Sequence, residues 1–300
     1  KDPQVGQHKW VMSFDLNSLY PHLIMQYNIS PEMLLPQTMP YNDNTIDEML
    51  SKQIDLSMLP DAKVARTPNG ALFRTKKQGF LPEMMQEMYN DRTIYKKKML
   101  TAKQQYEDTK DPKYLNDVSR YQNIQMARKI SLNSAYGAIG NEWFRYYDLK
   151  IAEGITTSGQ LSIRWIEKAL NGYLNKLLKS EEVDYVIASD TDSVYIRFDE
   201  LVNKVLTKRD AESEDSYRLR VVDFLDKIAK EKIEPFIDNS YQDLASYVNA
   251  FEQKMEMGRE AIADKGIWTA KKRYILNVWD MEGVRYQEPK LKIMGIEAVK

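Results

Sequence analysis

Hydrophobic and polar residues along this chain follow two spacings, one typical of β-strands and one typical of α-helices. Short runs rich in β-branched and aromatic residues predict strands. These runs lie at 10–16, 185–189, 194–198, 272–278 and 283–287. A hairpin is predicted over 63–74, because Pro68-Asn69-Gly70 in its middle has the chemistry of a tight turn. The predicted strands are therefore spread over the whole chain.

Two long helices are predicted between the early and late strands. The first covers 83–107, and the second begins at Asp111-Pro112, runs from about 112 to 136 and ends at Gly137. Each helix of about 25 residues is about 37 Å long. Because the connection is short, the two must run antiparallel as an arm that projects from the sheet. Further helical segments are predicted at 18–27, 150–178, 200–207 and 215–248.

The composition is typical of a globular chain, and it limits which side chains could bind a metal ion. The 300 residues are 43% hydrophobic and 29% charged, enough for a sizeable core and two subdomains. No apolar run approaches the roughly 20 residues that span a bilayer, so we expect no membrane segment. Cysteine is absent, and the only histidines are His8 and His22. Carboxylates would therefore hold any metal, which favours Mg²⁺ or Mn²⁺.

The charged residues are unevenly distributed although the formal net charge is only −1. Residues 62–104 contain ten Lys or Arg and three acids, whereas 199–264 contain ten Lys or Arg and sixteen acids. Such segregation permits an anion-binding surface on a nearly neutral protein. The chain begins at Lys1 and carries no terminal signal, so we expect it to be a piece of a longer protein.

Two aspartates lie at the tip of the hairpin formed by strands 185–189 and 194–198. The connecting residues are Asp190-Thr191-Asp192-Ser193. Asp and Ser are common turn residues, so turn formation alone explains them. The alternative is a metal or phosphate site built on the two carboxylates. The hairpin by itself leaves both interpretations open.

Cationic residues follow one face of each helix of the arm. Arg92 and Lys96 are four residues apart, and Lys129, Asn133 and Tyr136 share a face of the second helix. Lys and Arg also decorate ordinary solvated helices. Cations on an arm that faces carboxylates on a sheet are, however, the arrangement that a triphosphate with bound magnesium requires.

Three motifs in fixed order carry a family resemblance. DLNSLYP (15–21), KISLNSAYG (129–137) and SDTDS (189–193) resemble the DxxSLYP, KxxxNSxYG and YGDTDS signatures of family B DNA polymerases. WFRYYDL, ITTSGQ, KKRY and NVWDMEG look closer still to the replicative polymerases of T-even-type phages. The resemblance covers essentially the whole chain. Ser189 replaces the usual glycine before DTDS, and a serine suits a strand.

The resemblance implies an α+β fold with an antiparallel palm sheet, flanking helices and a two-helix antiparallel fingers arm. The implied domains are a first palm segment at 1–80, the fingers hairpin at 81–140 and a second palm segment at 141–300. The family's exonuclease and thumb would be absent from this chain. A palm without a thumb should hold duplex DNA weakly.

The resemblance also implies the metal chemistry of primer extension, which is phosphoryl transfer assisted by two metals about 3.5–4 Å apart. Asp15 and Asp192 would ligate two Mg²⁺ ions, with Mn²⁺ as a substitute, and the carbonyl of Leu16 would add a ligand. Asp190 would support them. Glu260, in GREAIA, resembles a further acid near the metals and is the remaining candidate metal ligand.

The remaining site residues are assigned by the same resemblance. Several residues would bind the nucleotide. The amides of Ser18 and Leu19 would contact phosphate oxygens, and the triphosphate would also be bound by Arg92, Lys96 and Lys129. Tyr20 would act as the steric gate against ribose, and Asn133 would border the base pair. Lys129 would also act as general acid toward pyrophosphate. Residues for DNA are Tyr136, Gly137, Lys271, Lys272, Arg273 and Tyr274. Without the resemblance, a core tyrosine remains an alternative for Tyr20.

The expected partners are primer–template DNA, dNTPs and, through segments outside this chain, a sliding clamp and other replication proteins. The expected location is the cytoplasm of an infected bacterium. Two alternatives remain open. The chain is a nucleotide-binding part of a split enzyme that cannot extend a primer alone, or it is a two-metal nuclease or another nucleotidyltransferase. The nuclease does not account for the cationic arm.

Overall fold

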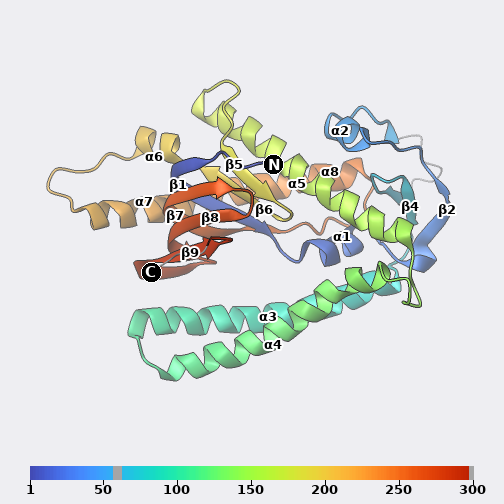
Figure 1. Ribbon diagram of the computed structural model, residues 1–300, viewed down its shortest axis with the longest axis horizontal. Coiled ribbons are helices and arrows are strands. Elements are labelled where there is room, and N and C mark those ends of the chain that lie inside the picture. The colour runs from blue at the N-terminus through green and yellow to red at the C-terminus, as the bar shows by residue number, and fades with distance from the viewer. Residues whose placement is uncertain (57–62, 297–300) are drawn as a thin grey trace.

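The computed structural model describes residues 1–56 and 63–296, and it contains a six-stranded sheet, a layer of helices and a long helical arm (Figure 1). The strand order is β5-β6-β1-β7-β8-β9, and every neighbouring pair is antiparallel. The strands are β1 (Gly6–Leu16), β5 (Val186–Asp190), β6 (Ser193–Arg197), β7 (Met257–Ala270), β8 (Arg273–Met281) and β9 (Val284–Met294). The predicted α+β fold with an antiparallel sheet is confirmed.

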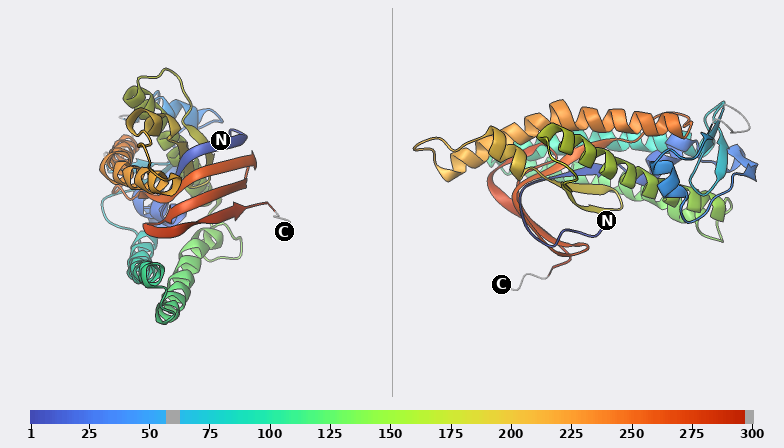
Figure 2. Two further views of the ribbon diagram at one scale, coloured as in Figure 1. Left: turned by 90° about the vertical axis from the view of Figure 1, so that its left-hand side faces the viewer. Right: turned by 90° about the horizontal axis from the view of Figure 1, so that it is seen from above.

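Helices cover one face of the sheet and leave the other face for the site (Figure 2). This layer contains α1 (Leu19–Tyr27), α5 (Leu149–Leu178), α6 (Asp199–Val205), α7 (Glu214–Ile228), the π-helical segment η3 (Ala229–Ile233) and α8 (Glu234–Tyr247). Side chains of β1 alternate between the faces, as the period of a strand requires. Met12 and Phe14 are buried in the main core, whereas Ser13 and Asp15 face the opposite side.

A smaller sheet packs beside this body. It contains β2 (Leu34–Thr38), β4 (Ala71–Arg74) and β3 (Val64–Arg66), with η1 (Pro31–Met33) and α2 (Thr45–Leu50) nearby. β3 and β4 form the hairpin predicted around Pro68-Asn69-Gly70. Gly70 has a φ of +76°, and a Cβ there would lie 2.2 Å from the carbonyl oxygen of Met39, so only glycine fits.

The arm consists of α3 (Phe80–Thr109) and α4 (Lys113–Ile139), which run antiparallel along one side of the body (Figure 1). The predicted pair of helices is confirmed, but its predicted end is wrong. Gly137 lies inside α4, which ends at Ile139 and is capped by Gly140, whose amide donates to the carbonyl of Tyr136 over 3.1 Å. A single glycine is tolerated within this 27-residue helix because it costs only about 1 kcal/mol relative to alanine.

Three other regions of the structure differ from the prediction. β7 was not predicted, because the segment GREAIADKGIW mixes charges and glycines with its apolar residues. The helix predicted at 215–248 is divided into α7 and α8 by η3, and Pro235 lies at the start of α8. The last strand continues to Met294 instead of ending at 287, since alternation persists through its basic residues.

Candidate active site

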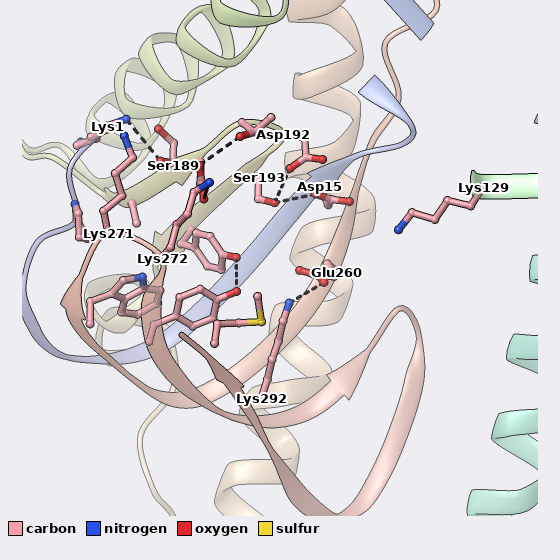
Figure 3. Close-up of a pocket in the computed structure, with 18 residues that line it drawn as sticks. Lys1, Asp15, Lys129, Ser189, Asp192, Ser193, Glu260, Lys271, Lys272 and Lys292 are labelled. Atoms are coloured by element: carbon pink, nitrogen blue, oxygen red, sulfur yellow. Dashed lines mark hydrogen bonds and ion pairs between the residues drawn. The ribbon is translucent and has the colours of Figure 1, made fainter. Parts of the chain in front are cut away.

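A cavity of about 530 Å³ opens on the face of the sheet that the helices leave uncovered (Figure 3). Asp15 enters it from β1, Asp190 and Asp192 from the β5–β6 hairpin, and Glu260 from β7. Lys129 approaches from α4 on the arm, and its side chain points across the gap toward Asp15. Carboxylates from three parts of the chain therefore share one space with a cation from a fourth.

Backbone pairing between β1 and β6 brings Asp15 to the hairpin tip. Asp15 is the register partner of Ser193, and the amide of Leu16 donates to the carbonyl of Asp192 over 2.8 Å. The Ser193 hydroxyl donates to Asp15 Oδ1 over 2.7 Å and lies 3.4 Å from Asp192 Oδ1. A two-residue turn, Thr191-Asp192, then presents the second carboxylate beside the first.

Ionisation of this carboxylate pair is opposed by its surroundings. Burial, and then the negative charge of Asp192, raise the pKa of Asp15 to about 7. Burial and the charge of Asp190 raise the pKa of Asp192, while Lys129 lowers it. Two carboxylates that resist ionisation together are stabilised by a nearby cation, and their oxygen donors suit a hard divalent ion.

Glu260 reaches the cavity through a β-bulge in β7. Ser13 pairs with Ala261 and Phe14 with Arg259, so one extra residue, Glu260, is inserted between the paired positions. The bulge re-aims this residue toward the cavity. Its carboxylate accepts a 2.9 Å hydrogen bond from the Ser13 hydroxyl and forms a 2.7 Å ion pair with Lys292.

Lys292 on β9 was not identified from the sequence. Burial opposes its charge, but the neighbouring Glu260 and Asp15 carboxylates raise the pKa of Lys292. It thus supplies a fixed positive charge at the base of the acidic cluster (Figure 3). Within residues 1–56 and 63–296, no group of three or more His, Cys, Asp or Glu side chains forms a ready-made metal site.

The KKRY segment does not lie wholly on a strand as predicted. Lys271 and Lys272 form the two-residue connection between Ala270 on β7 and Arg273 on β8, and Lys272 has a φ of 60°. The strand predicted at 272–278 therefore begins one residue later, at Arg273.

The turn nevertheless places several of these side chains at the cavity. Lys271, Lys272 and Tyr274 line it, while Arg273 is exposed on β8. Lys272 Nζ lies 3.8 Å from Asp190 Oδ2, a long and exposed ion pair. The buried Tyr274 exchanges a 2.8 Å hydrogen bond with the hydroxyl of Tyr195.

Tyr20 and Tyr136 meet where the arm joins the body. Their ring centroids are 4.7 Å apart at an interplanar angle of 45°. Burial, and then the neighbouring Tyr136 hydroxyl and Asp192 carboxylate, raise the pKa of Tyr20, which is only partly buried. Asn133 and Gly137 are exposed on α4, and a Cβ added to Gly137 would meet nothing within 4 Å. Open space therefore adjoins this aromatic pair.

The three cations assigned to the triphosphate do not line one cavity. Lys129 lines the cavity with the aspartates, whereas Arg92 and Lys96 line a second cavity of about 600 Å³ together with Asn17. Arg92 is 7% exposed and donates to the Ser18 hydroxyl over 2.6 Å, so it is not a solvated surface residue. Lys96 forms a 2.7 Å ion pair with Glu282.

The loop between β1 and α1 positions backbone donors beside Arg92. Ser18 adopts a left-handed conformation with φ 45°, and helix α1 begins at Leu19. The first amides of a helix have no partner within it and carry partial positive charge, which suits phosphate oxygens. Ser18 therefore contributes both an amide and the hydroxyl that orients Arg92.

The comparisons with known proteins point in one direction. A family model described as DNA polymerase family B matches residues 2–211. The whole chain is 38% identical to a DNA-directed DNA polymerase of Escherichia phage RB69, and 99% of it is 36% identical to that of Enterobacteria phage T4. A DNA polymerase beta of African swine fever virus is 26% identical over the whole chain. The chain spans 37% of each phage polymerase and 24% of the African swine fever virus protein. In the described residues, no helix is long and apolar enough to cross a membrane.

Proposed function

Because the chain belongs to DNA polymerase family B, we propose that it is the palm and fingers portion of a polymerase that joins a dNTP to a primer 3′-hydroxyl. One observation carries the proposal. Asp15 and Asp192, far apart in the sequence, lie in one cavity with Lys129 of the arm pointing toward Asp15. The catalytic set is Asp15, Asp190, Asp192 and Lys129.

The carboxylate pair suits divalent metal ions. Asp15, Asp192 and the carbonyl of Leu16 would hold two Mg²⁺ ions, for which Mn²⁺ could substitute, with Asp190 as a supporting group. Bound metal would supply Lewis-acid stabilisation of charge during phosphoryl transfer. Glu260 would not ligate the metals directly, because its carboxylate oxygens already bind Lys292 and Ser13. Its role is to hold Lys292 beneath Asp15.

The nucleotide's phosphates would bind between the arm and the start of α1. The amides of Ser18 and Leu19 offer donors, and Arg92 is held beside them by the Ser18 hydroxyl. Lys129 would donate a proton to the departing pyrophosphate. Its positive charge lowers the pKa of Asp192 across the cavity that both residues line.

The sugar and bases would lie over the aromatic contact at the base of the arm. Tyr20 would sit beneath the sugar and exclude a 2′-hydroxyl by direct collision. Asn133, Tyr136 and Gly137 would border the new base pair, with open space beside Gly137 for the template. Lys271, Lys272, Arg273 and Tyr274 would hold the primer end through phosphate contacts and packing.

Other parts of the function concern the larger protein. Its partners would be primer–template DNA, dNTPs and, through segments outside this chain, a sliding clamp and further replication proteins. It would act in the cytoplasm of an infected bacterium, as the two phage relatives suggest. A second candidate is a part of a split enzyme that binds nucleotide but cannot extend a primer alone. This candidate is worth testing because the chain spans only 37% of the length of each phage polymerase.

Primer extension tests the proposal. The purified chain is incubated with primer–template, dNTPs and Mg²⁺, with and without the remaining polymerase segments supplied in trans. We expect extension that Asp192→Asn reduces by at least a hundredfold, because the site loses charge where metals must bind. Asp210→Asn, in the exposed turn before α7, is the matched control and should retain activity. Near wild-type turnover of Asp192→Asn would contradict the metal assignment.

Extension only with added segments would favour the split-enzyme alternative. Cleavage of the DNA without extension would favour a nuclease.

A further inference from the structure

One face of α3 contacts the palm at three levels. Tyr89 donates to Glu256 over 3.1 Å, Lys96 pairs with Glu282 over 2.7 Å, and Gln104 Oε1 accepts a 3.0 Å hydrogen bond from the amide of Arg285. Positions 89, 96 and 104 are separated by about two helical turns each, so they share a face. The arm therefore rests on the β8–β9 hairpin as well as on its own base.

The turn that carries Glu282 is rigidly held. Glu282 and Gly283 form a two-residue hairpin connection with φ values of 51° and 85°, which is the geometry that suits twisted strands. The buried Asp280 accepts from the amide of Gly283 and from Arg285 Nε, each over 3.0 Å. The Glu282 amide donates to the carbonyl of Glu260 over 2.6 Å. The carboxylate of Glu282 is thus presented to α3 by a fixed support.

The ion pair keeps Lys96 away from the acidic cavity. Lys96 lines the second cavity, on the side of α3 that also carries Arg92, while Lys129 alone of the three cations lines the cavity with Asp15. The side chains of Lys96 and Glu282 are 26% and 34% exposed, so the pair is accessible to a competing anion. Triphosphate oxygens are strong competitors because they carry more charge than one carboxylate.

We propose that Glu282 is a positioning residue, which holds Lys96 in the nucleotide-free chain and competes for it with the phosphates of the incoming nucleotide. This inference rests on the proposed function. Release from Glu282 frees Lys96 to join Arg92 and Lys129 on the triphosphate. The contact therefore weakens nucleotide binding and tunes the range of dNTP concentrations to which the site responds.

The test compares Glu282→Gln with Glu288→Gln. Glu288 is an exposed acid on β9, the strand that follows the Glu282 turn, and it lines a different cavity, so it is a matched control. The dissociation constant for Mg-dCTP is measured by equilibrium titration on the purified chain, with saturating primer–template whose primer ends in a dideoxynucleotide. We expect Glu282→Gln to lower this constant about two- to fivefold, the range set by a partly exposed ion pair, and Glu288→Gln to leave it unchanged. In a Lys96→Ala background, Glu282→Gln should have no effect.

A salt series separates competition from a structural effect. The difference between wild type and Glu282→Gln should shrink at about 0.5 M KCl, because salt screens the ion pair. An unchanged or increased dissociation constant in a Glu282→Gln chain that unfolds at the wild-type temperature would overturn the inference. Failure of a chain that binds dCTP to extend a primer with a free 3′-hydroxyl, in the separate extension assay, would contradict the proposed function but not this inference. Absence of dCTP binding in every variant would contradict both.

Discussion

At the residue scale, the motifs located the carboxylates but not the groups that set their chemistry. Asp15 and Asp192 lie in named signatures, whereas Ser193 and Lys292 act through contacts made only in the folded chain. A lysine on a late strand has no sequence signal that connects it with an acid near residue 260. The quoted SDTDS motif did contain Ser193, and its hydroxyl could have been proposed as a partner of the neighbouring aspartates.

Asp15 also makes a testable contribution to stability. Its folded pKa of about 7 lies above the roughly 3.9 of an unfolded aspartate, so the folded state binds the extra proton between these values. Stability of the metal-free chain should therefore fall as pH rises from about 4 to about 7. Asp15→Asn removes the penalty and should raise the free energy of unfolding at pH 7.5 by about 2–4 kcal/mol in EDTA.

Urea unfolding followed by circular dichroism measures this change, with Asp210→Asn as the control. Added Mg²⁺ should stabilise the wild type more than Asp15→Asn. Equal stability of wild type and Asp15→Asn in EDTA at pH 7.5 would show that the ionised Asp15 carboxylate does not destabilise the folded chain.

At the element scale, hydrophobic spacing predicted most strands and the two arm helices. It did not predict the end of α4, the bulge in β7 or β7 itself. Gly137 resembled a helix end, yet α4 continues past it. The bulge at Glu260 adds one residue to β7, and no local pattern marks such an insertion because it is defined by the partner strand. The charged residues of β7 mask its alternation. These features depend on tertiary pairing, which a single sequence does not display.

We expect two elements to supply cations for two separate tasks, DNA binding and nucleotide use, and this division can be measured. Lys272 lies in the β7–β8 turn and Lys129 on α4. Lys272→Ala should weaken primer–template binding and reduce the salt slope of log affinity by about 0.9, the value for one phosphate contact. Lys129→Ala should leave DNA affinity nearly unchanged but reduce the catalytic efficiency for dNTPs by at least tenfold. Fluorescence anisotropy at several KCl concentrations and steady-state extension give the two quantities.

Lys272 Nζ lies 3.8 Å from Asp190 Oδ2, so Lys272→Ala also removes a weak ion pair with the Asp190 carboxylate. A similar fall in DNA affinity for both variants would contradict the division of tasks.

At the scale of the whole molecule, the acidic and basic segments of the sequence lie in different parts of the fold. The acid-rich segment 199–264 includes α6, α7 and α8, which lie in the layer of helices, whereas the basic segment 62–104 includes most of α3 in the arm. Lys129, Lys271 and Lys272, outside both segments, border the cavity. A chain of nearly zero net charge can thus present cations to DNA. The order of the three motifs predicted this architecture, but the contact of the arm with the β8–β9 hairpin required the fold.

The last prediction concerns how tightly this chain alone holds DNA. The cavity is open, and the cations at its border include only a few lysines, so binding should be dominated by phosphate contacts without enclosure of the duplex. Such electrostatic binding has dissociation constants of about 10⁻⁴ to 10⁻⁶ M at physiological salt and weakens steeply as salt rises. We therefore expect micromolar or weaker affinity for primer–template at 0.15 M KCl, and at least a tenfold gain when the remaining polymerase segments are added in trans. Anisotropy titrations at 0.05, 0.1 and 0.2 M KCl measure both effects. Nanomolar affinity of the chain alone at 0.2 M KCl would show that the palm and arm enclose the duplex without help.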